Sequence, residues 1–407
     1  MTIGLTDRFP RRAAVATCAL CVAGLLALTP ATAAAEATAP APGAAVPGPA
    51  LLYHSGVQVR PHAGAPAVPD VSALSWLVAD ADTGEVLAAN QAHLRLPPAS
   101  TLKTLFALTV LPALPAGLEH RVTPGELADV EEGSSLVGVE EGHTYRVADL
   151  WRGVFLSSGN DAVHVLAALD GGWDRTVTRM QTKARSLGAL DTHVESPDGY
   201  DAPGQVSSAY DLAVFGRTGL RNPDFARYCS TAEARFPAGD GWSFGIENTN
   251  RLLTGEDGVG RYPGMIGIKN GYTSNAGNTL VAAARRGGRT LVVTVMNPQD
   301  GGVYDEARQL LDWGFGAAGR VDPVGSLDAL RPAPRPGPST VPMAAATASQ
   351  DDSGWPDTAV VAAVAALGAG AVTLAMRLRG DRSDRSRRAE PPTPTGPDGP
   401  SGPAGRG

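Results

Sequence analysis

The sequence predicts an α+β fold in which helices flank an antiparallel sheet and also form an all-helical subregion. Strand-like segments interrupted by turn residues occupy residues 75–88 and 279–295, near the two ends of the part expected to fold. The region between them has the apolar spacing of helices instead. Strands at both ends with helices between them favour a sheet covered by helices.

Each expected element has a local signal. Residues 75–79 and 85–88 flank the turn Asp82-Thr83-Gly84, which is typical of a β-hairpin. Residues 279–284 and 290–295 flank a turn rich in Arg and Gly and predict a second hairpin. Apolar spacing predicts four intervening helices and a last helix that packs on the sheet, at residues 100–111, 147–156, 162–169, 175–187 and 306–315.

The ends of the chain differ in composition from the segment between them, residues 71–320, which we expect to be one folded domain. Residues 1–35 have arginines, then an apolar run, then small residues around Ala33, the order of a cleaved secretory signal peptide. An uncleaved membrane anchor is the alternative. We expect a flexible leader at residues 36–70 and a Pro/Ala-rich linker at residues 331–357.

Residues 358–376 carry no charged side chain and precede a cluster of arginines. This length is just sufficient for a transmembrane helix, and the basic flank predicts that residues 377–407, a basic and then disordered tail, are cytoplasmic. A buried or interfacial Ala-rich helix is the alternative. The two ends together predict an exported protein that a C-terminal helix holds on the outer face of the cytoplasmic membrane.

Composition also excludes several classes of function. A net charge of −7 and a pI of about 5.5 argue against a nucleic-acid partner. None of the seven histidines forms H-E-x-x-H or a close pair, so we expect no metal, and we expect the histidines to be structural or surface residues. No phosphate-binding Gly-rich loop is present, so we expect no cofactor.

Two of the three lysines in the chain belong to short motifs. Lys103 closes Ser100-Thr101-Leu102-Lys103, and Lys269 opens Lys269-Asn270-Gly271. Ser158-Gly159-Asn160 lies between them, so S-x-x-K, S-x-N and K-x-G occur in that order. The same order is typical of penicillin-binding proteins and class A β-lactamases.

The first motif can activate a serine. Prolines at positions 97 and 98 place Ser100 in the first turn of the following helix, where Lys103 shares its face. A lysine, unlike an arginine, can lose its proton and act as a base. Burial and a second cation, which Lys269 could supply, would lower the pKa of Lys103. The alternative is that Ser100 caps the helix and Lys103 is solvated.

The other two motifs suit substrate handling. Ser158 could relay a proton and Asn160 could hold a substrate backbone, although Asn160 or Asp161 could instead cap a helix. Lys269, beside a glycine in a strand, suits a substrate carboxylate docked along a sheet edge. The alternative for Lys269 is an exposed lysine in a turn.

The chain resembles the D-alanyl-D-alanine carboxypeptidase family of low-molecular-mass penicillin-binding serine peptidases. The resemblance covers about residues 75–315 and includes Ser196-Pro197-Asp198-Gly199 besides the three motifs. Further matching segments lie at residues 180–188, 208–213 and 267–273. The resemblance implies a β-lactamase/transpeptidase-like fold and a bacterial enzyme that removes the terminal D-alanine from peptidoglycan stem peptides.

The resemblance also implies residue roles. Ser100 would attack the peptide carbonyl, Lys103 would accept its proton, and Ser158 would relay a proton to the leaving amine. Backbone N–H groups of Ser100 and Tyr272 would form an oxyanion hole, and β-lactams would trap the acyl-enzyme. The substrate-binding residues would be Asn160, Lys269, Asn270, Gly271 and Tyr272.

One departure from the family pattern keeps two alternatives open. Asn270 stands where the family usually has Thr, so a hydroxyl contact to the substrate carboxylate becomes an amide contact. A non-catalytic cell-wall peptide-binding module is therefore one alternative. A β-lactamase-like hydrolase is the other, although no E-x-x-L-N segment supplies a deacylating glutamate.

Overall fold

The computed structural model describes residues 49–330 apart from Gly301 and Ala329. The predicted signal peptide (1–35), linker (331–357), transmembrane helix (358–376) and cytoplasmic tail (377–407) lie outside these residues, as does the first part of the predicted leader. Within the described range, no helix has the length and apolar character needed to span a bilayer.

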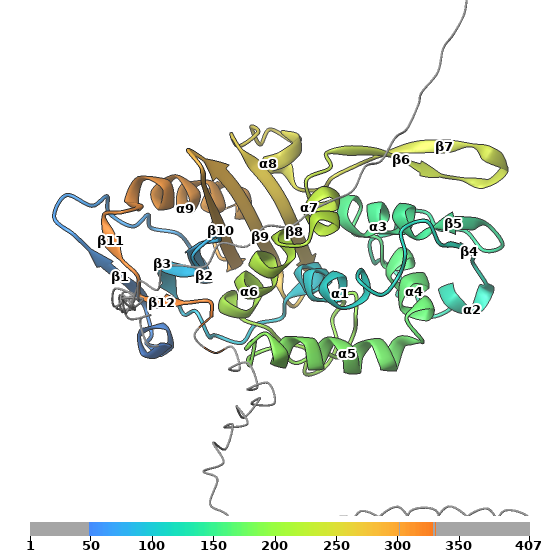
Figure 1. Cartoon of the computed structure of the whole chain (residues 1–407), viewed down its shortest axis with the longest axis horizontal. Helices are drawn as coiled ribbons and strands as arrows, with labels where there is room; N and C mark the ends of the chain where they lie inside the picture. The colour runs from blue at the N-terminus through green and yellow to red at the C-terminus, as the bar shows by residue number, and fades with distance from the viewer. Residues whose placement is uncertain (1–48, 301, 329, 331–407) are drawn as a thin grey trace, which may run out of the picture. The chain divides into compact units, whose positions relative to one another are not determined.

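A single antiparallel sheet is the centre of the described part (Figure 1). Its strands are β1 (Val57–Pro61), β2 (Ala73–Asp80), β3 (Glu85–Asn90), β8 (Met265–Thr273), β9 (Gly277–Arg286), β10 (Arg289–Pro298), β11 (Val321–Asp322) and β12 (Gly325–Ser326). The order is β11-β1-β3-β2-β10-β9-β8, and β12 also pairs with β3. Strands from near the two ends of the described part therefore pair at the centre of the sheet, where Leu77 of β2 lies opposite Thr294 of β10.

Both predicted hairpins are confirmed. Residues 75–88 fall in β2 and β3, which pair antiparallel, and residues 279–295 fall in β9 and β10. The segment Lys269-Asn270-Gly271, which the sequence placed just before the second hairpin, lies within β8 and pairs with β9. It therefore lies on a strand at the edge of the sheet.

The five predicted helices are also confirmed, with ends that differ by a few residues. They are α1 (Lys103–Val110), α3 (Val147–Leu156), α4 (Asn160–Leu169), α5 (Trp173–Ser186) and α9 (Val303–Ala317). The 3₁₀ turn η2 (Ala99–Leu102) leads directly into α1. The remaining elements are η1 (Pro49–Tyr53), α2 (Pro124–Leu127), α6 (Ala209–Leu220), α7 (Pro223–Cys229), η3 (Gly239–Gly241), α8 (Arg251–Thr254) and the hairpins β4–β5 (Glu119–Arg121, Thr144–Arg146) and β6–β7 (Glu233–Pro237, Ser243–Glu247).

Helices cover both faces of the sheet, as the α+β prediction requires (Figure 1). Trp76 and Val78 of β2 join the apolar cluster that contains α9, whereas Leu77 and Ala79 join the cluster that contains α1 and α6. Because adjacent strand residues point to opposite faces, β2 is buried on both sides. Helices α2 to α5 extend this second cluster into the predicted all-helical subregion.

The predicted limits of the folded domain are wrong at both ends. Residues 49–70, expected to be part of a flexible leader, include η1 and β1, and β1 pairs with β3 and β11. Pro66 accepts a hydrogen bond from the Trp313 indole of α9. The domain also continues past residue 320 into β11 and β12. The Pro/Ala-rich composition of residues 36–70 gave no indication of β1, because strand pairing uses backbone groups. Pro61 lies at the end of β1, where a missing N–H is tolerated.

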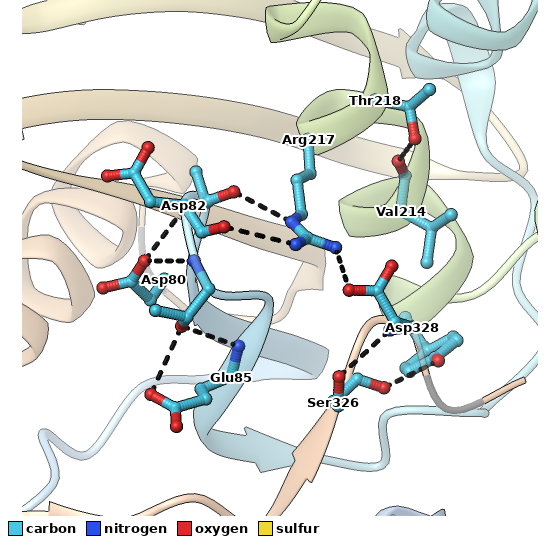
Figure 2. Close-up of polar contacts among 11 residues, drawn as sticks. Asp80, Asp82, Glu85, Val214, Arg217, Thr218, Ser326 and Asp328 are labelled. Atoms are coloured by element: carbon cyan, nitrogen blue, oxygen red, sulfur yellow. Dashed lines mark hydrogen bonds and ion pairs between the residues drawn. The ribbon is translucent and has the colours of Figure 1, made fainter. Parts of the chain in front are cut away.

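A buried arginine joins the C-terminal strand to the rest of the domain. Figure 2 shows Arg217 of α6 between the β2–β3 turn and the segment that follows β12. Its guanidinium donates to the Ala81 carbonyl and to the Asp328 carboxylate, each at 2.8 Å, and also contacts the Asp82 carbonyl. Three distant segments therefore share one buried cation, which supports a domain that extends to at least residue 328.

Candidate active site

Ser100 and Lys103 meet as their spacing predicts. Ser100 lies in η2 and Lys103 begins α1, and the Lys103 Nζ donates to the Ser100 Oγ at 2.9 Å. Lys103 is 1% exposed, so the alternative of a solvated surface lysine is wrong. Its Nζ also donates to the Asn160 Oδ1 at 2.7 Å and to the Asp198 carbonyl at 2.6 Å. The amine is therefore held in one position against the serine.

The environment of Lys103 makes a base available near neutral pH. Burial lowers the pKa of Lys103 to about 8, against the opposing influence of Asp198, Glu131 and Asp161, whose negative charges raise it. A substantial share of the amine is then neutral at mildly alkaline pH. A neutral amine within hydrogen-bond reach of a hydroxyl can accept its proton.

The second motif joins α3 to α4. Asn160 begins α4 and directs its side-chain oxygen to Lys103, and the cap residue Gly159 has no side chain, so the alternative of an Asn160 or Asp161 helix cap is wrong. The Asp161 carboxylate instead accepts the backbone N–H groups of residues 137–139. The Ser158 Oγ is buried and makes no hydrogen bond within the described structure. It is thus free to serve a substrate.

Lys269 lies buried in β8, so the alternative of an exposed lysine in a turn is also wrong. The residue is 1% exposed, and its Nζ donates to the Asn270 carbonyl at 2.8 Å. Burial, followed by repulsion from the positive charge of Lys103, lowers the pKa of Lys269 well below its ordinary value. The charge of Lys103 thus acts on Lys269, but the predicted lowering of the Lys103 pKa by Lys269 is not among the causes of its shift, which are burial and three carboxylates that the sequence did not indicate.

Gly271 allows β8 to pack directly against the serine. A Cβ at position 271 would lie 2.6 Å from the Ser100 backbone nitrogen and 3.0 Å from the Ala99 Cβ, closer than side chains tolerate. Tyr272, the next residue, is 68% exposed, so its ring lies at the surface while its backbone pairs with Asn278. Only glycine at this position brings the edge strand next to the Ser100 N–H.

Backbone strain accompanies all three motifs. Ala99 precedes Ser100 with φ 49°, Ser158 itself has φ 59°, and Ile268 precedes Lys269 with φ 130°. These are three of the six non-glycine residues with positive φ in the described range. Such conformations cost about 1–3 kcal/mol each and concentrate at functional sites, where the surrounding packing enforces them. The three reactive segments are therefore held in place by the fold.

Several residues at this site carried no assigned role in the sequence. The Asp198 carbonyl holds Lys103, and Thr279 of β9 donates to the Pro98 carbonyl and so ties the sheet to η2. The Thr249 Oγ1 donates to the Asn270 Oδ1 at 2.9 Å. Of these residues, only Asp198 could have been found from the sequence, because it lies in one of the segments that carry the family resemblance.

An open cavity adjoins β8 on the side of Asn270. Its volume is about 460 Å³, which is enough for a short peptide segment. The lining includes Thr249, Asn270, Gly271, Tyr272, Thr279 and Tyr304. Of the predicted site residues, only Asn270, Gly271 and Tyr272 line it, so the cavity adjoins the Ser100–Lys103 pair without containing it. The catalytic and binding roles of these residues stay predictions.

Comparison with known proteins gives consistent matches. A family model described as D-alanyl-D-alanine carboxypeptidase, peptidase S11, matches residues 62–300. The D-alanyl-D-alanine carboxypeptidase DacB2 of Mycobacterium tuberculosis is 42% identical over 271 residues, which is 65% of this chain and 89% of that protein. DacD of Escherichia coli is 37% identical over 265 residues, which is 61% of this chain and 64% of that protein.

Solved structures give the same result for the fold. A D-alanyl-D-alanine carboxypeptidase from M. tuberculosis aligns with a TM-score of 0.61 at 40% identity and covers 66% of this chain and all of that one. Penicillin-binding protein 6B from E. coli aligns with a TM-score of 0.55 at 34% identity, over 64% of this chain and 82% of that one.

Proposed function

This chain belongs to the D-alanyl-D-alanine carboxypeptidase family, and on that premise we propose that it removes the terminal D-alanine from peptidoglycan stem peptides through an acyl-enzyme on Ser100. One observation carries the proposal: a buried lysine amine contacts the Ser100 hydroxyl at 2.9 Å. A serine next to a positioned base is the arrangement of covalent catalysis. The protein is thus a serine-type peptidase of the penicillin-binding class.

Acylation begins at the Ser100–Lys103 pair. The Ser100 Oγ attacks the carbonyl carbon of the penultimate D-alanine while its proton passes to the neutral Lys103 amine. Asn160 and the Asp198 carbonyl hold that amine in line with the hydroxyl. Negative charge develops on the carbonyl oxygen, and the backbone N–H groups of Ser100 and Tyr272 would stabilise it. Losing one such donor typically lowers the rate by about 10²–10³-fold.

The leaving group departs as its nitrogen gains a proton. The Ser158 Oγ is buried without a hydrogen-bond partner in the described structure, so it is available to pass a proton from Lys103 to that nitrogen. Water then attacks the Ser100 ester and releases the shortened peptide. A β-lactam would acylate Ser100 in the same way, and its ring-opened product would remain attached.

Lys269 would bind the terminal carboxylate of the peptide. Within the described residues its Nζ donates to a carbonyl of its own strand, and an incoming carboxylate supplies the anionic partner that a buried ammonium needs. Binding would then favour the charged form of Lys269. The carboxylate and the ammonium would then form a buried ion pair beside the reacting serine.

Asn270 would contribute a second contact to the same carboxylate. Its Oδ1 accepts a hydrogen bond from Thr249, which leaves the amide NH₂ group as the donor. An amide donor can replace the hydroxyl that the family usually has at this position. The buried Ser100–Lys103 pair argues against a non-catalytic peptide-binding module. The carboxypeptidase relatives and the lack of an E-x-x-L-N segment argue against a β-lactamase-like hydrolase.

We propose in addition that the protein is exported and held on the outer face of the bacterial cytoplasmic membrane. The support is the signal-like order of residues 1–35 and the uncharged segment 358–376 with its basic flank. A membrane-bound position would place the enzyme beside its wall substrate. Cell fractionation tests this directly: the full chain should sediment with membranes, whereas a chain truncated after residue 330 should be released from them.

Two assays test the enzymatic proposal. A fluorescent penicillin should label the purified full chain covalently, and Ser100→Ala should abolish the label. A D-Ala-D-Ala peptide should release D-alanine, which distinguishes a carboxypeptidase from a β-lactamase. A matched control is Ser157→Ala, the neighbouring serine outside the trio, which should retain both activities. Labelling that persists in Ser100→Ala would overturn the proposal.

A further inference from the structure

A cluster of three potential metal ligands lies close to Lys103. One ligand atom comes from each of Glu131, His164 and Asp198, and these three atoms all lie within 4.8 Å of one another. The residues come from the loop after α2, from α4 and from the loop after α5, so only the tertiary fold brings them together. Their chemistry is one imidazole and two carboxylates, a ligand set that suits Zn²⁺.

The ligand atoms are buried without hydrogen-bond partners. His164 is 8% exposed and Asp198 is fully buried, yet the His164 Nε2, the Asp198 Oδ2 and the Glu131 Oε2 make no hydrogen bond within the described structure. The second oxygen of Asp198 accepts from Ser196 and from the Tyr200 N–H, which fixes the carboxylate. Buried polar atoms are normally hydrogen-bonded, so three atoms without a hydrogen bond that lie within 4.8 Å of one another indicate a missing partner.

Charge and distance also fit a dication. Two carboxylates within one cluster repel each other, and a dication between them would relieve that repulsion. Ligand atoms on one tetrahedral zinc ion lie roughly 3.6 Å apart at a Zn–O distance of about 2.2 Å. The His164 Nε2 and Glu131 Oε2 are 3.9 Å apart, and all three ligand atoms lie within 4.8 Å of one another. The cluster would therefore contract when it binds the ion.

An acidic cavity gives access to the cluster. It has a volume of about 450 Å³, and Glu131 and His164 both line it. The Trp173 ring packs against the His164 ring at 4.2 Å between centroids and so limits its rotation. Three further acidic residues line the same cavity, and their negative field would attract cations: Glu126, Asp129 and Asp174.

We propose that Glu131, His164 and Asp198 form a binding site for one Zn²⁺ ion, with water completing the coordination. The ion would neutralise the two carboxylates and tie the Asp198 loop to α4. Because the Asp198 carbonyl holds Lys103, the ion would support the position of the catalytic amine without touching the substrate. The proposal departs from the expectation, drawn from the sequence, of no metal and of histidines that are only structural or surface residues. The proposal does not depend on the peptidase activity.

Metal binding to the full chain in detergent tests the proposal. Chelator-treated protein is titrated with ZnCl₂ by calorimetry, and its thermal unfolding is followed with and without zinc. We expect one ion per chain and a higher Tm in zinc. Glu131→Gln and His164→Gln should each weaken zinc binding by about tenfold or more, since each removes a ligand. The control His193→Gln changes an exposed histidine that pairs with Glu195 and should bind zinc as the wild type does.

The outcomes separate the proposal from its rivals. Glu131→Gln is isosteric and changes a partly exposed residue, so it remains informative if His164→Gln does not fold. Equal zinc affinity in the wild type and in Glu131→Gln would assign the ion to another place on the chain. If the wild type binds no zinc, the cluster instead shares a proton between its carboxylates. Either result overturns the proposal.

Discussion

The two buried lysines of the active site have opposite surroundings. Lys103 and Lys269 are each 1% exposed. Lys103 donates to Ser100, Asn160 and the Asp198 carbonyl and lies near three carboxylates. In the described structure Lys269 donates to a carbonyl of its own strand, and the charge that helps burial to lower its pKa is the positive charge of Lys103. Burial is therefore equal in the two lysines, and the partners differ.

This difference separates two functions for the same type of side chain. The fold supplies Lys103 with its partners, so its pKa stays near 8 and its position is set before substrate arrives. Lys269 lacks an anionic partner in the described structure, and a substrate carboxylate would complete its site. A base must be positioned before the substrate binds. A cation that binds the substrate contributes more binding energy when the fold supplies no anionic partner of its own.

Replacing the base should produce the largest effect. Lys103→Arg keeps the charge but cannot lose a proton, so the rate of acylation should fall by about 10²–10⁴-fold. Stopped-flow measurement of covalent labelling by a fluorescent penicillin gives this rate. Lys183→Arg changes the remaining lysine, near the end of α5, and should acylate at the normal rate. Full activity in Lys103→Arg would show that Lys103 is not the base, and the functional difference between the two lysines would then be lost.

Removing the binding cation should produce a smaller, substrate-dependent effect. Lys269→Gln should lower kcat/KM for a D-Ala-D-Ala peptide by about 30-fold or more, because losing one partner of a buried charge pair costs about 2 kcal/mol or more. A peptide with an amidated C-terminus lacks the anion and should be hydrolysed equally slowly by the wild type and the variant. If Lys269→Gln hydrolyses the free acid normally, the carboxylate binds elsewhere.

The pH dependence should distinguish the lysines further. Lys103 is charged and inactive below its pKa, so the acylation rate should rise with pH through about 8 and fall about tenfold per unit below it. Lys269 is not among the causes that set the pKa of Lys103, so Lys269→Gln should lower the rate without moving the midpoint of the profile. Acylation rates measured from pH 5 to pH 10 check both statements. A midpoint that moves in Lys269→Gln would mean that Lys269 helps to set the pKa of the base.

The neighbour of Lys269 should give the smallest effect. Thr249→Val removes the hydroxyl that orients the Asn270 amide, a hydrogen bond worth about 1 kcal/mol, so KM should rise about fivefold while kcat changes little. Thr249→Ser restores the hydroxyl and should restore KM. Steady-state kinetics on the D-Ala-D-Ala peptide measures both values. A loss of kcat without a change in KM would place Thr249 in the chemistry and not in carboxylate binding.

Much of the fold and part of the site were predictable because their signals are local. Turn residues and apolar spacing indicated the two hairpins and the five helices. Ser100 and Lys103 are three residues apart on one helical turn, so their contact follows from helix geometry. The strand β1 was missed because its alternating residues Val57-Gln58-Val59-Arg60 form a short run inside a Pro/Ala/Gly-rich segment. A strand was expected around Lys269, but the full extent of β8 was not, because a buried edge strand that begins with a bulge lacks regular alternation.

The sequence by itself determined which residue types are available: one amine beside one hydroxyl, a second motif with Ser158 and Asn160, and a lysine next to a glycine. Only the tertiary structure decided how those groups differ in function. The groups that surround Lys103 lie far from it along the chain, between 57 residues (Asn160) and 166 residues (Lys269) away. No local pattern in the sequence predicts that they come together. Burial, nearby carboxylates and the lack of a partner are properties of three-dimensional packing, and they set the proton affinity of each lysine.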